Sequence, residues 1–478
     1  MAVIVCGIAS ALLLFLREYY WPLAWLAPIP LLWLAYSRRP FRAVLAATAG
    51  AVVLALSAVV AQYISAGGAQ AVPPVPILAF MIVSMILVNT ACLTVARIER
   101  RNLSAVWSLL TYPMLWTSMS YVWLLAASGD SYGLPAYSQV DAPALIQSAS
   151  VFGLWGIEFL LALFANALAL AYWDRQHRLL YSVVAIGGFL ANLAFGLIRL
   201  HAPTGTTVRV AVAAQDIPLT ERLPFGTDRA LATTAAYAAA ARSHAVRDAQ
   251  VIVFPELTAI LSPQWREQAL EPLATAARDT GAWITMGFAD AAGPEEHRNV
   301  ALTFRPNLEP ARYIKRHTLQ PLDTSIRGHA AGVVADGRAV AICKDLDFPA
   351  TIRSDARLGI QLMMVPAADF EVDGWTHARM AIFRGVENGF SVARAARNGL
   401  LTLSDDRGRV LSRATTNKQR IIAVIADLPV GTGPTIYRRF GDFFAWICIA
   451  LSVVLLVHGR FRRKQRVLLP LPSEKGEL

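Results

Sequence analysis

Charged residues are scarce in this chain, and their scarcity excludes an ordinary soluble enzyme. Only 16% of the 478 residues are charged, while 55% are hydrophobic; globular proteins carry roughly 25% charged residues. The deficit is uneven, because no charged residue occurs from Ala43 to Ala96, whereas residues 201–436 have a mixed composition. The pattern predicts a polytopic membrane protein with one large water-soluble insert.

Motifs that bind metals or phosphates are also missing. The sequence contains no CxxC pair, no HExxH motif and no glycine-rich phosphate loop, so we expect neither a metal nor a cofactor. The net charge of +11 does not require a nucleic-acid partner. Much of it lies in Arg residues that flank apolar segments, where anionic lipid attracts them.

Eight apolar segments approach the length of about 20 residues that a membrane span needs. They are 2–20, 21–36, 43–65, 76–96, 104–127, 150–172, 179–200 and 441–457. Arg-rich loops follow every second segment, and basic loops stay in the cytoplasm. We therefore expect cytoplasmic termini, seven spans in 1–200, an extracytoplasmic domain in 201–436, and an eighth span with a basic tail in 437–478.

The insert alternates short apolar runs with helical stretches, which is typical of an α/β layered domain. We expect strands at Thr207–Ala213, Val251–Phe254, Ala282–Phe288, 298–304, 311–316, Arg338–Cys343, 359–365, 390–396, 400–404 and 420–426. Helices are expected at 228–247, 263–278, 346–357 and 375–388. Reactive groups in such domains gather at strand ends.

Three expected strands end in residues that can act together in covalent catalysis: Glu256, Lys315 and Cys343. The other three cysteines lie in predicted spans, so Cys343 has no disulfide partner in the insert and is a candidate nucleophile, although a lone Cys can also be a small buried hydrophobe. Lysine is rare here, with five among 44 basic residues. A thiolate attacks, a carboxylate takes its proton, and an ammonium stabilises the oxyanion.

This ordered set, behind seven predicted spans and ahead of one, resembles the bacterial apolipoprotein N-acyltransferases. Other matching segments are Tyr137-Ser138-Gln139, Leu145-Ile146-Gln147, Trp155-Gly156, the strand starting at Val208, Arg394 with Asn398-Gly399, and Thr435 to Asp442. The resemblance implies a membrane bundle that carries a nitrilase-like (carbon–nitrogen hydrolase) αββα sandwich. It also implies location in the bacterial inner membrane, with the sandwich in the periplasm.

By the same resemblance, Glu256 is the general base, Lys315 the oxyanion stabiliser and Cys343 the acyl-accepting nucleophile. The family takes an acyl chain from a phospholipid onto the Cys as a thioester. It then passes the chain to the α-amine of a lipid-modified N-terminal cysteine on a lipoprotein. Lipid surroundings restrict the water that would otherwise hydrolyse the thioester.

The chain departs from the family pattern around the presumed site. Phe254 stands where the family usually has Trp, and no Glu follows Lys315 at the usual distance, which leaves Asp323 as a candidate replacement. After the nucleophile, Lys344-Asp345 replaces Tyr-Glu. Asp345 is expected to keep the supporting acid, and Lys344 to lower the pKa of the neighbouring thiol.

Two alternatives remain open at this stage. The chain can be a membrane-tethered amidase, or an acyltransferase for another amine, with the same three residues. It can also be a transporter or binding scaffold. A transporter should carry ionisable residues within its spans, but only Glu158 clearly does so here, and we interpret it as structural because it lies near a span end. His317 and His377 are further candidates near the site, and each can either orient a carboxylate or be an ordinary packed histidine. The aromatic tracts Tyr132–Tyr137 and Trp375–His377 are assigned either to lipid or acceptor contact or to packing.

Overall fold

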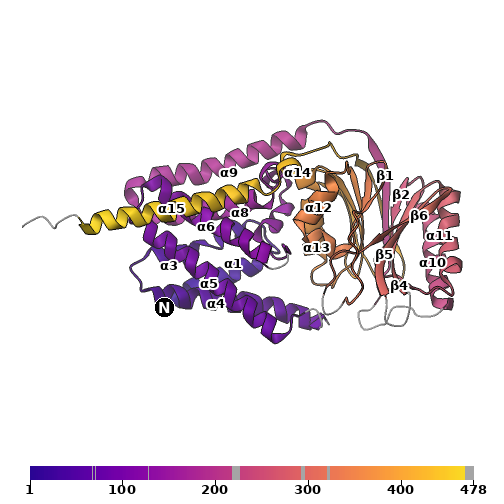
Figure 1. The fold of residues 1–478 in the computed structure, drawn as a ribbon, viewed down its shortest axis with the longest axis horizontal. Helices are drawn as coiled ribbons and strands as arrows, with labels where there is room; N and C mark the ends of the chain where they lie inside the picture. Colours follow the sequence, from indigo (N-terminus) through magenta and orange to yellow (C-terminus); the bar gives the residue numbers. More distant parts are fainter. Residues whose placement is uncertain are drawn as a thin grey trace, which may run out of the picture.

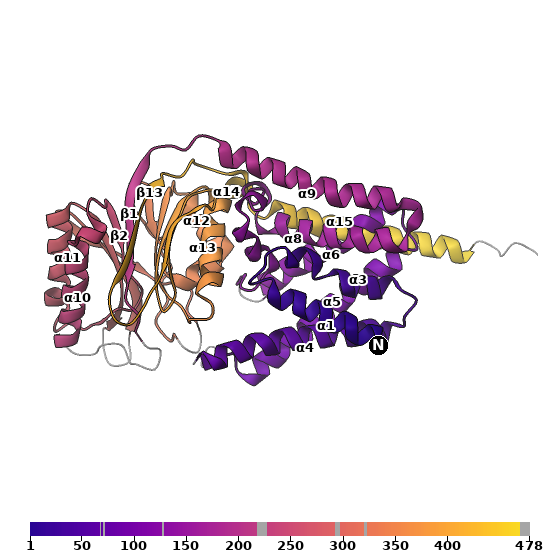
Figure 2. The ribbon, with the colours of Figure 1, turned by 180° about the vertical axis from the view of Figure 1, so that it is seen from behind.

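The computed structural model describes residues 1–66, 68–69, 72–126, 129–217, 227–291, 297–319 and 323–468, with side chains as far as 460. A bundle of helices forms one half of the molecule and an α/β domain forms the other (Figure 1). Two segments join the halves: the chain after helix α9 and the chain before helix α15, which lie next to each other in both views (Figure 2).

The bundle is built from apolar helices. They are α1 (Ala2–Leu16), α2 (Leu23–Leu26), α3 (Ile29–Tyr36), α4 (Phe41–Ser65), α5 (Val75–Glu99), α6 (Ala105–Ala126), α8 (Leu154–Trp173), α9 (Arg178–His201) and α15 (Phe443–Leu468). Five segments among the described residues are long and apolar enough to cross a membrane: α4, α5, α8, α9 with the turn before it, and α15.

The other three predicted spans fall on α1, on the α2–α3 pair and on α6. Helix α1 has 15 residues. The second predicted span is two short helices because Pro28 and Pro30 interrupt it, and a proline lacks the N–H that would continue a helix. The predicted count of eight therefore stays a prediction for these three segments.

Between α6 and α8 the chain forms short helical turns on the end of the bundle that faces the α/β domain. They are η2 (Pro135–Asp141), η3 (Pro143–Leu145) and α7 (Ala149–Phe152). Glu158, at the start of α8, is fully buried and accepts hydrogen bonds from Trp116 Nε1 at 2.9 Å and from the backbone N of Ala136 at 2.8 Å. These contacts agree with the structural role expected for Glu158, because its carboxylate holds η2 on the bundle.

The α/β domain contains two sheets within the described residues. The first has the order β13-β1-β2-β4-β5-β6 with β3 beside β4, and its strands are β1 (Thr207–Ala214), β2 (Val251–Val253), β3 (Ile260–Leu261), β4 (Trp283–Ala291), β5 (His297–Arg305), β6 (Leu308–Ile314) and β13 (Ile422–Pro429). The second has the order β12-β11-β10-β9-β8-β7, with β7 (Val333–Ala335), β8 (Arg338–Val340), β9 (Leu362–Ala368), β10 (Ser391–Arg397), β11 (Leu400–Ser404) and β12 (Val410–Thr415).

Helices cover the outer face of each sheet, which confirms the predicted αββα sandwich. Helices α10 (Thr227–Ala241) and α11 (Arg266–Thr280) lie on the first sheet, and α12 (Pro349–Ala356) and α13 (Gly374–Asn388) lie on the second (Figure 1). The central strands pair in parallel and are buried on both faces, so they read as continuous apolar runs. The α12–α13 layer faces the bundle in both views.

The structure differs from the expected elements in two useful places. The strand expected at Arg338–Cys343 ends at Val340, and Cys343 begins a 3₁₀ turn, η6 (Cys343–Asp347). Strand β12 was not expected, because its side chains alternate between partly buried and exposed and include Ser412 and Arg413, as suits an edge strand.

Candidate active site

Cys343 lies in a strained turn. Its φ of 42° is in the left-handed region, which costs a non-glycine residue about 1–3 kcal/mol. The buried carboxylate of Asp345 stabilises the turn by accepting the backbone N–H of Ile342 at 3.0 Å. The same carboxylate accepts the hydroxyl of Tyr313 at 2.7 Å and the backbone N–H of His317 at 2.9 Å. Asp345 thus joins the turn that carries Cys343 to the end of strand β6.

Lys315 and Glu256 form a buried ion pair. Lys315 follows β6, and its Nζ lies 2.6 Å from Oε1 of Glu256; the two side chains are 5% and 2% exposed. Asn299, on the neighbouring strand β5, donates Nδ2 to the same Oε1 at 2.6 Å. The Oε2 of Glu256 has no hydrogen-bond partner in the part of the chain that the structure describes. This oxygen is therefore free to accept a proton.

The backbone of Glu256 bridges the two sheets. Its N–H donates to the carbonyl of Ala367 on β9 at 3.2 Å, and its carbonyl accepts Nε of Arg397 at 3.0 Å. The approach of β4 is equally close, since a Cβ on Gly287 would lie 2.6 Å from the Cα of Glu256. Glycine is required at Gly287 by this contact, which fixes the carboxylate between the sheets.

Asp323 supplies a second carboxylate to the same ammonium. Its Oδ2 lies 3.5 Å from Nζ of Lys315, and its Oδ1 accepts the backbone N–H of Ser325 at 3.1 Å. Burial alone would raise the pKa of Asp323, but the Lys315 ammonium and the hydrogen bonds hold it below its usual value. The candidate replacement for the family's acid therefore lies where it can act on Lys315.

The thiol of Cys343 is kept protonated by its surroundings. Burial is the largest cause and raises its pKa; the Glu256 carboxylate raises it further, while Lys315 and Arg394 offset only part of the effect. Its Sγ lies 3.5 Å from the carbonyl oxygen of Ala368. A thiol with so high a pKa needs a base in order to react, and the Glu256 carboxylate, whose charge acts on this thiol, is a candidate.

Lys344, the residue after Cys343, pairs with two carboxylates. Its Nζ lies 2.6 Å from Asp130 and 3.1 Å from Asp347, and the main charges that act on the thiol of Cys343 come from other residues. Lys344 therefore ties the turn that carries Cys343 to the chain after α6, and its expected effect on the pKa of the thiol stays a prediction.

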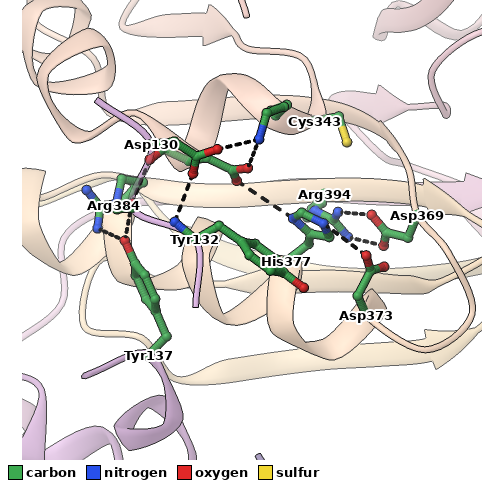
Figure 3. Close-up of polar contacts among 12 residues, drawn as sticks. Asp130, Tyr132, Tyr137, Cys343, Asp369, Asp373, His377, Arg384 and Arg394 are labelled. Carbon is green, nitrogen blue, oxygen red and sulfur yellow. Dashed lines mark hydrogen bonds and ion pairs between the residues drawn. The ribbon is translucent and has the colours of Figure 1, made fainter. Parts of the chain in front are cut away.

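Two supporting residues were not identified from the sequence: Asn299 and Asp369. Asp369 follows β9 and makes a bidentate ion pair with Arg394, at 2.9 Å and 2.5 Å, with both side chains almost fully buried (Figure 3). A polar residue at an inward position of a strand was the available signal for Asn299. Asp369 gave no such signal, because it lies after a strand in a loop of mixed composition.

The two histidines do not touch the Glu256–Lys315 pair. His317 stacks on Phe348 with ring centroids 3.5 Å apart, and burial together with Arg316 lowers its pKa to about 4. Burial opposes protonation of His377, but Asp373 and the other carboxylate beside it, Asp347, raise its pKa well above the usual value.

The aromatic tracts pack between the two halves of the molecule. Trp375 donates Nε1 to Asp141 at 3.0 Å, and the guanidinium of Arg379 lies 5.5 Å from its ring centroid. Tyr137 hydrogen-bonds both Ser131 at 2.6 Å and Arg384 at 2.7 Å (Figure 3). These contacts account for both tracts by packing and polar pairing within the chain, and the assignment to lipid or acceptor contact stays a prediction.

Comparison with known proteins finds two family models on this chain. The apolipoprotein N-acyltransferase N-terminal domain matches residues 9–167, and carbon-nitrogen hydrolase matches residues 209–432. The apolipoprotein N-acyltransferase of Geobacter metallireducens is 26% identical over 93% of this chain and 92% of the relative. That of Vibrio parahaemolyticus is 24% identical over 94% of each.

Among solved structures, a nitrilase-superfamily amidase from Nesterenkonia is 23% identical with a TM-score of 0.38, covering 48% of this chain and 93% of the amidase. The two family models cover both halves of the molecule, and the relatives align over nearly the whole chain. The chain therefore belongs to the apolipoprotein N-acyltransferase family, within the nitrilase (carbon–nitrogen hydrolase) superfamily.

Proposed function

We propose that this protein transfers an acyl chain from a membrane phospholipid, through a thioester on Cys343, to the α-amine of a diacylglyceryl-modified lipoprotein. The observation that carries the proposal is the grouping of Cys343, Lys315 and Glu256 in a domain attached to an apolar bundle. Lys344, the residue after Cys343, pairs with Asp130 in the chain after α6, so the turn that carries Cys343 lies next to the bundle.

The first half-reaction forms the thioester. Oε2 of Glu256 takes the thiol proton while Sγ of Cys343 bonds to the ester carbonyl carbon of the phospholipid. The carbonyl oxygen becomes an oxyanion, which the ammonium of Lys315 stabilises. The ester C–O bond then breaks, and Glu256 returns the proton to the departing oxygen, so a lysophospholipid leaves.

The second half-reaction forms the amide. The neutral amine of the lipoprotein attacks the thioester carbonyl carbon, and Lys315 stabilises the second oxyanion. The C–S bond breaks, and the surplus amine proton passes through Glu256 to Sγ, which restores the thiol. Asp323 acts through Lys315: a second carboxylate keeps the ammonium charged when Glu256 is protonated.

The proposal includes a location and an orientation. We place the protein in the bacterial inner membrane, with both termini in the cytoplasm and the α/β domain in the periplasm, because the Arg-rich loops lie on one side. Alkaline phosphatase fusions test this. A fusion after residue 101 is expected to be inactive and one after residue 205 active, and the reverse result would overturn the orientation.

Mass spectrometry of the purified protein tests the donor. Incubation with palmitoyl-oleoyl phosphatidylethanolamine is expected to add an acyl group to Cys343, with Cys343→Ala and Glu256→Gln abolishing the adduct. Cys448→Ala, a buried thiol in α15, is the matched control and should acylate normally. A folded protein that forms no adduct would overturn the phospholipid donor and favour an amidase with a soluble substrate.

The acceptor is tested with the isolated acyl-enzyme. A synthetic diacylated lipopeptide with a free N-terminal amine is expected to discharge the thioester and gain the acyl chain. The same peptide with an acetylated amine is the control and should leave the thioester intact. Discharge by small amines but not by the lipopeptide would show that this chain serves a different acceptor.

A further inference from the structure

A ring of residues linked by polar contacts joins the turn that carries Cys343 to helix α4 and to the chain after α6; Figure 3 labels its members Asp130, Tyr132, Asp373 and His377. The ring runs through Lys344, Asp130, Tyr132, Tyr63, Asp373, His377, Asp347 and back to Lys344. Its members come from four segments that are far apart in the sequence: the end of α4, the chain after α6, η6 and the start of α13.

The contacts of the ring are short at the places where the bundle meets the α/β domain. Nζ of Lys344 lies 2.6 Å from Asp130, and the hydroxyl of Tyr63 lies 2.7 Å from Asp373. The two tyrosine hydroxyls, of Tyr63 and Tyr132, are 2.8 Å apart. The chain after α6 is therefore a direct neighbour of the active-site turn, and α4 is connected to it through Tyr132 and through the start of α13.

A second connection lies beside the ring and involves the backbone. Ser131 donates both its N–H and its Oγ to the carbonyl oxygen of Asp347, at 2.9 Å and 2.6 Å. Asp347 ends η6, the turn that Cys343 begins. The turn that carries Cys343 is therefore attached to the chain after α6 at two points: Lys344 near its start and Asp347 at its end.

The charged side chains of the ring are mostly buried, so their ion pairs are stronger than pairs at an exposed surface. Asp347 and Asp373 are 1% and 4% exposed, and Lys344 and His377 are 17% and 16% exposed, so solvent screens the pairs only weakly. Lys344 lies within 4 Å of the carboxylates of Asp130 and Asp347, and His377 lies within 4 Å of those of Asp347 and Asp373. Loss of the Lys344 ammonium would remove the cation that lies between Asp130 and Asp347 and would leave Asp347 with His377 alone.

We propose that Lys344 is a positioning residue that transmits the placement of α4 and α6 to Cys343, so that the thiol is aligned with an acyl donor held at the membrane. The inference rests on the proposed function, because it concerns the lipid donor. The thiol's own chemistry is set by Glu256, Lys315 and Arg394, which Lys344 does not contact. Lys344 should therefore affect reaction with a lipid donor and leave reaction with a small soluble reagent unchanged.

The test compares two rates at Cys343 in the full-length protein in detergent. One is acylation by palmitoyl-oleoyl phosphatidylethanolamine, and the other is alkylation by iodoacetamide. We expect Lys344→Met and Asp130→Asn each to slow acylation about tenfold, since misplacement of a nucleophile by about 1 Å costs up to 100-fold. Alkylation should stay within about twofold of the parent rate.

The double variant identifies the contact as the cause. When two residues act through one contact, the effects of replacing them do not add. Acylation of the double variant Lys344→Met with Asp130→Asn should therefore be slowed about tenfold and not 100-fold. Lys344→Arg keeps the charge and should retain acylation within about threefold. Lys418→Met, at an exposed lysine, is the matched control and should behave as the parent.

Each remaining outcome has one meaning. Parent-like acylation in both single variants, a 100-fold loss in the double variant, or a parallel loss of alkylation would each overturn the role of Lys344. Failure of the parent protein to form an adduct would instead remove the proposed phospholipid donor, and the inference with it.

Discussion

Replacement of Lys315 by Met tests whether the ion pair in the active site is as desolvated as the structure indicates. The ammonium lies 2.6 Å from Glu256 and 3.5 Å from Asp323, and its side chain is 5% exposed. Met has a similar length and no charge. The variant thus leaves two carboxylates near one another in a buried site with no cation between them.

The expected loss of stability is large. Removal of one partner from a buried ion pair destabilises a protein by about 3–5 kcal/mol, because the other charge remains buried without compensation. For a domain of this size, 1 kcal/mol corresponds to about 2–4 °C in Tm. The unfolding transition of the α/β domain should therefore fall by about 6–20 °C in Lys315→Met, and acylation of Cys343 should be lost.

Thermal unfolding in detergent, followed by near-UV circular dichroism, measures the change. Lys418→Met is the control and should unfold within about 1 °C of the parent, because Lys418 is exposed. The double variant Lys315→Met with Asp323→Asn removes one of the two facing carboxylates and should regain part of the loss. A decrease below about 2 °C in the single variant would refute the claim that the pair is desolvated.

Three further predictions concern the thiol of Cys343, the imidazole of His317 and the carboxylate of Glu158. Alkylation of Cys343 by iodoacetamide should accelerate continuously from pH 7 to 9, because its raised pKa leaves little thiolate at neutral pH; a plateau near pH 7 would contradict this. His317 has a folded-state pKa of about 4, so the parent should lose stability as pH falls below about 6.5, where only the unfolded state takes up the proton. His317→Phe should show a smaller decrease in Tm between pH 6.5 and 4.5. Glu158→Leu leaves buried donors unpaired, including Trp116 Nε1, and should lower the Tm by the equivalent of about 1–3 kcal/mol per donor, whereas an unchanged Tm would show that water replaces the carboxylate.

Most of the fold was predictable because it depends on patterns that are local in the sequence. The uncharged stretch predicted the bundle, and the alternation of apolar runs with helical stretches predicted the layered domain with most of its strands. Boundaries were less predictable where a tertiary contact decides them. The strand before Cys343 stops early because the carboxylate of Asp345 pulls the chain into a turn.

The candidate site was predictable in its residue types and less so in its contacts. Rare residues at strand ends identified Lys315 and Cys343, and the structure brings Lys315 together with Glu256. Asn299 and Asp369 were missed because their partners are distant in the sequence. Adjacency in the sequence suggested that Lys344 acts on the thiol, but its long side chain instead reaches Asp130, 214 residues away.

The departures from the family pattern fall into two groups with different consequences. Asp323 stands where the family pattern has a Glu, and the structure still gives Lys315 two carboxylates, those of Glu256 and Asp323. Asp345 likewise keeps an acid, which organises the turn of the nucleophile. Lys344 is different, because it adds a cation that pairs with the chain after α6. Lys344 is thus the departure that meets the bundle, and we predict that differences in donor or acceptor choice arise at that contact rather than at Asp323 or Asp345.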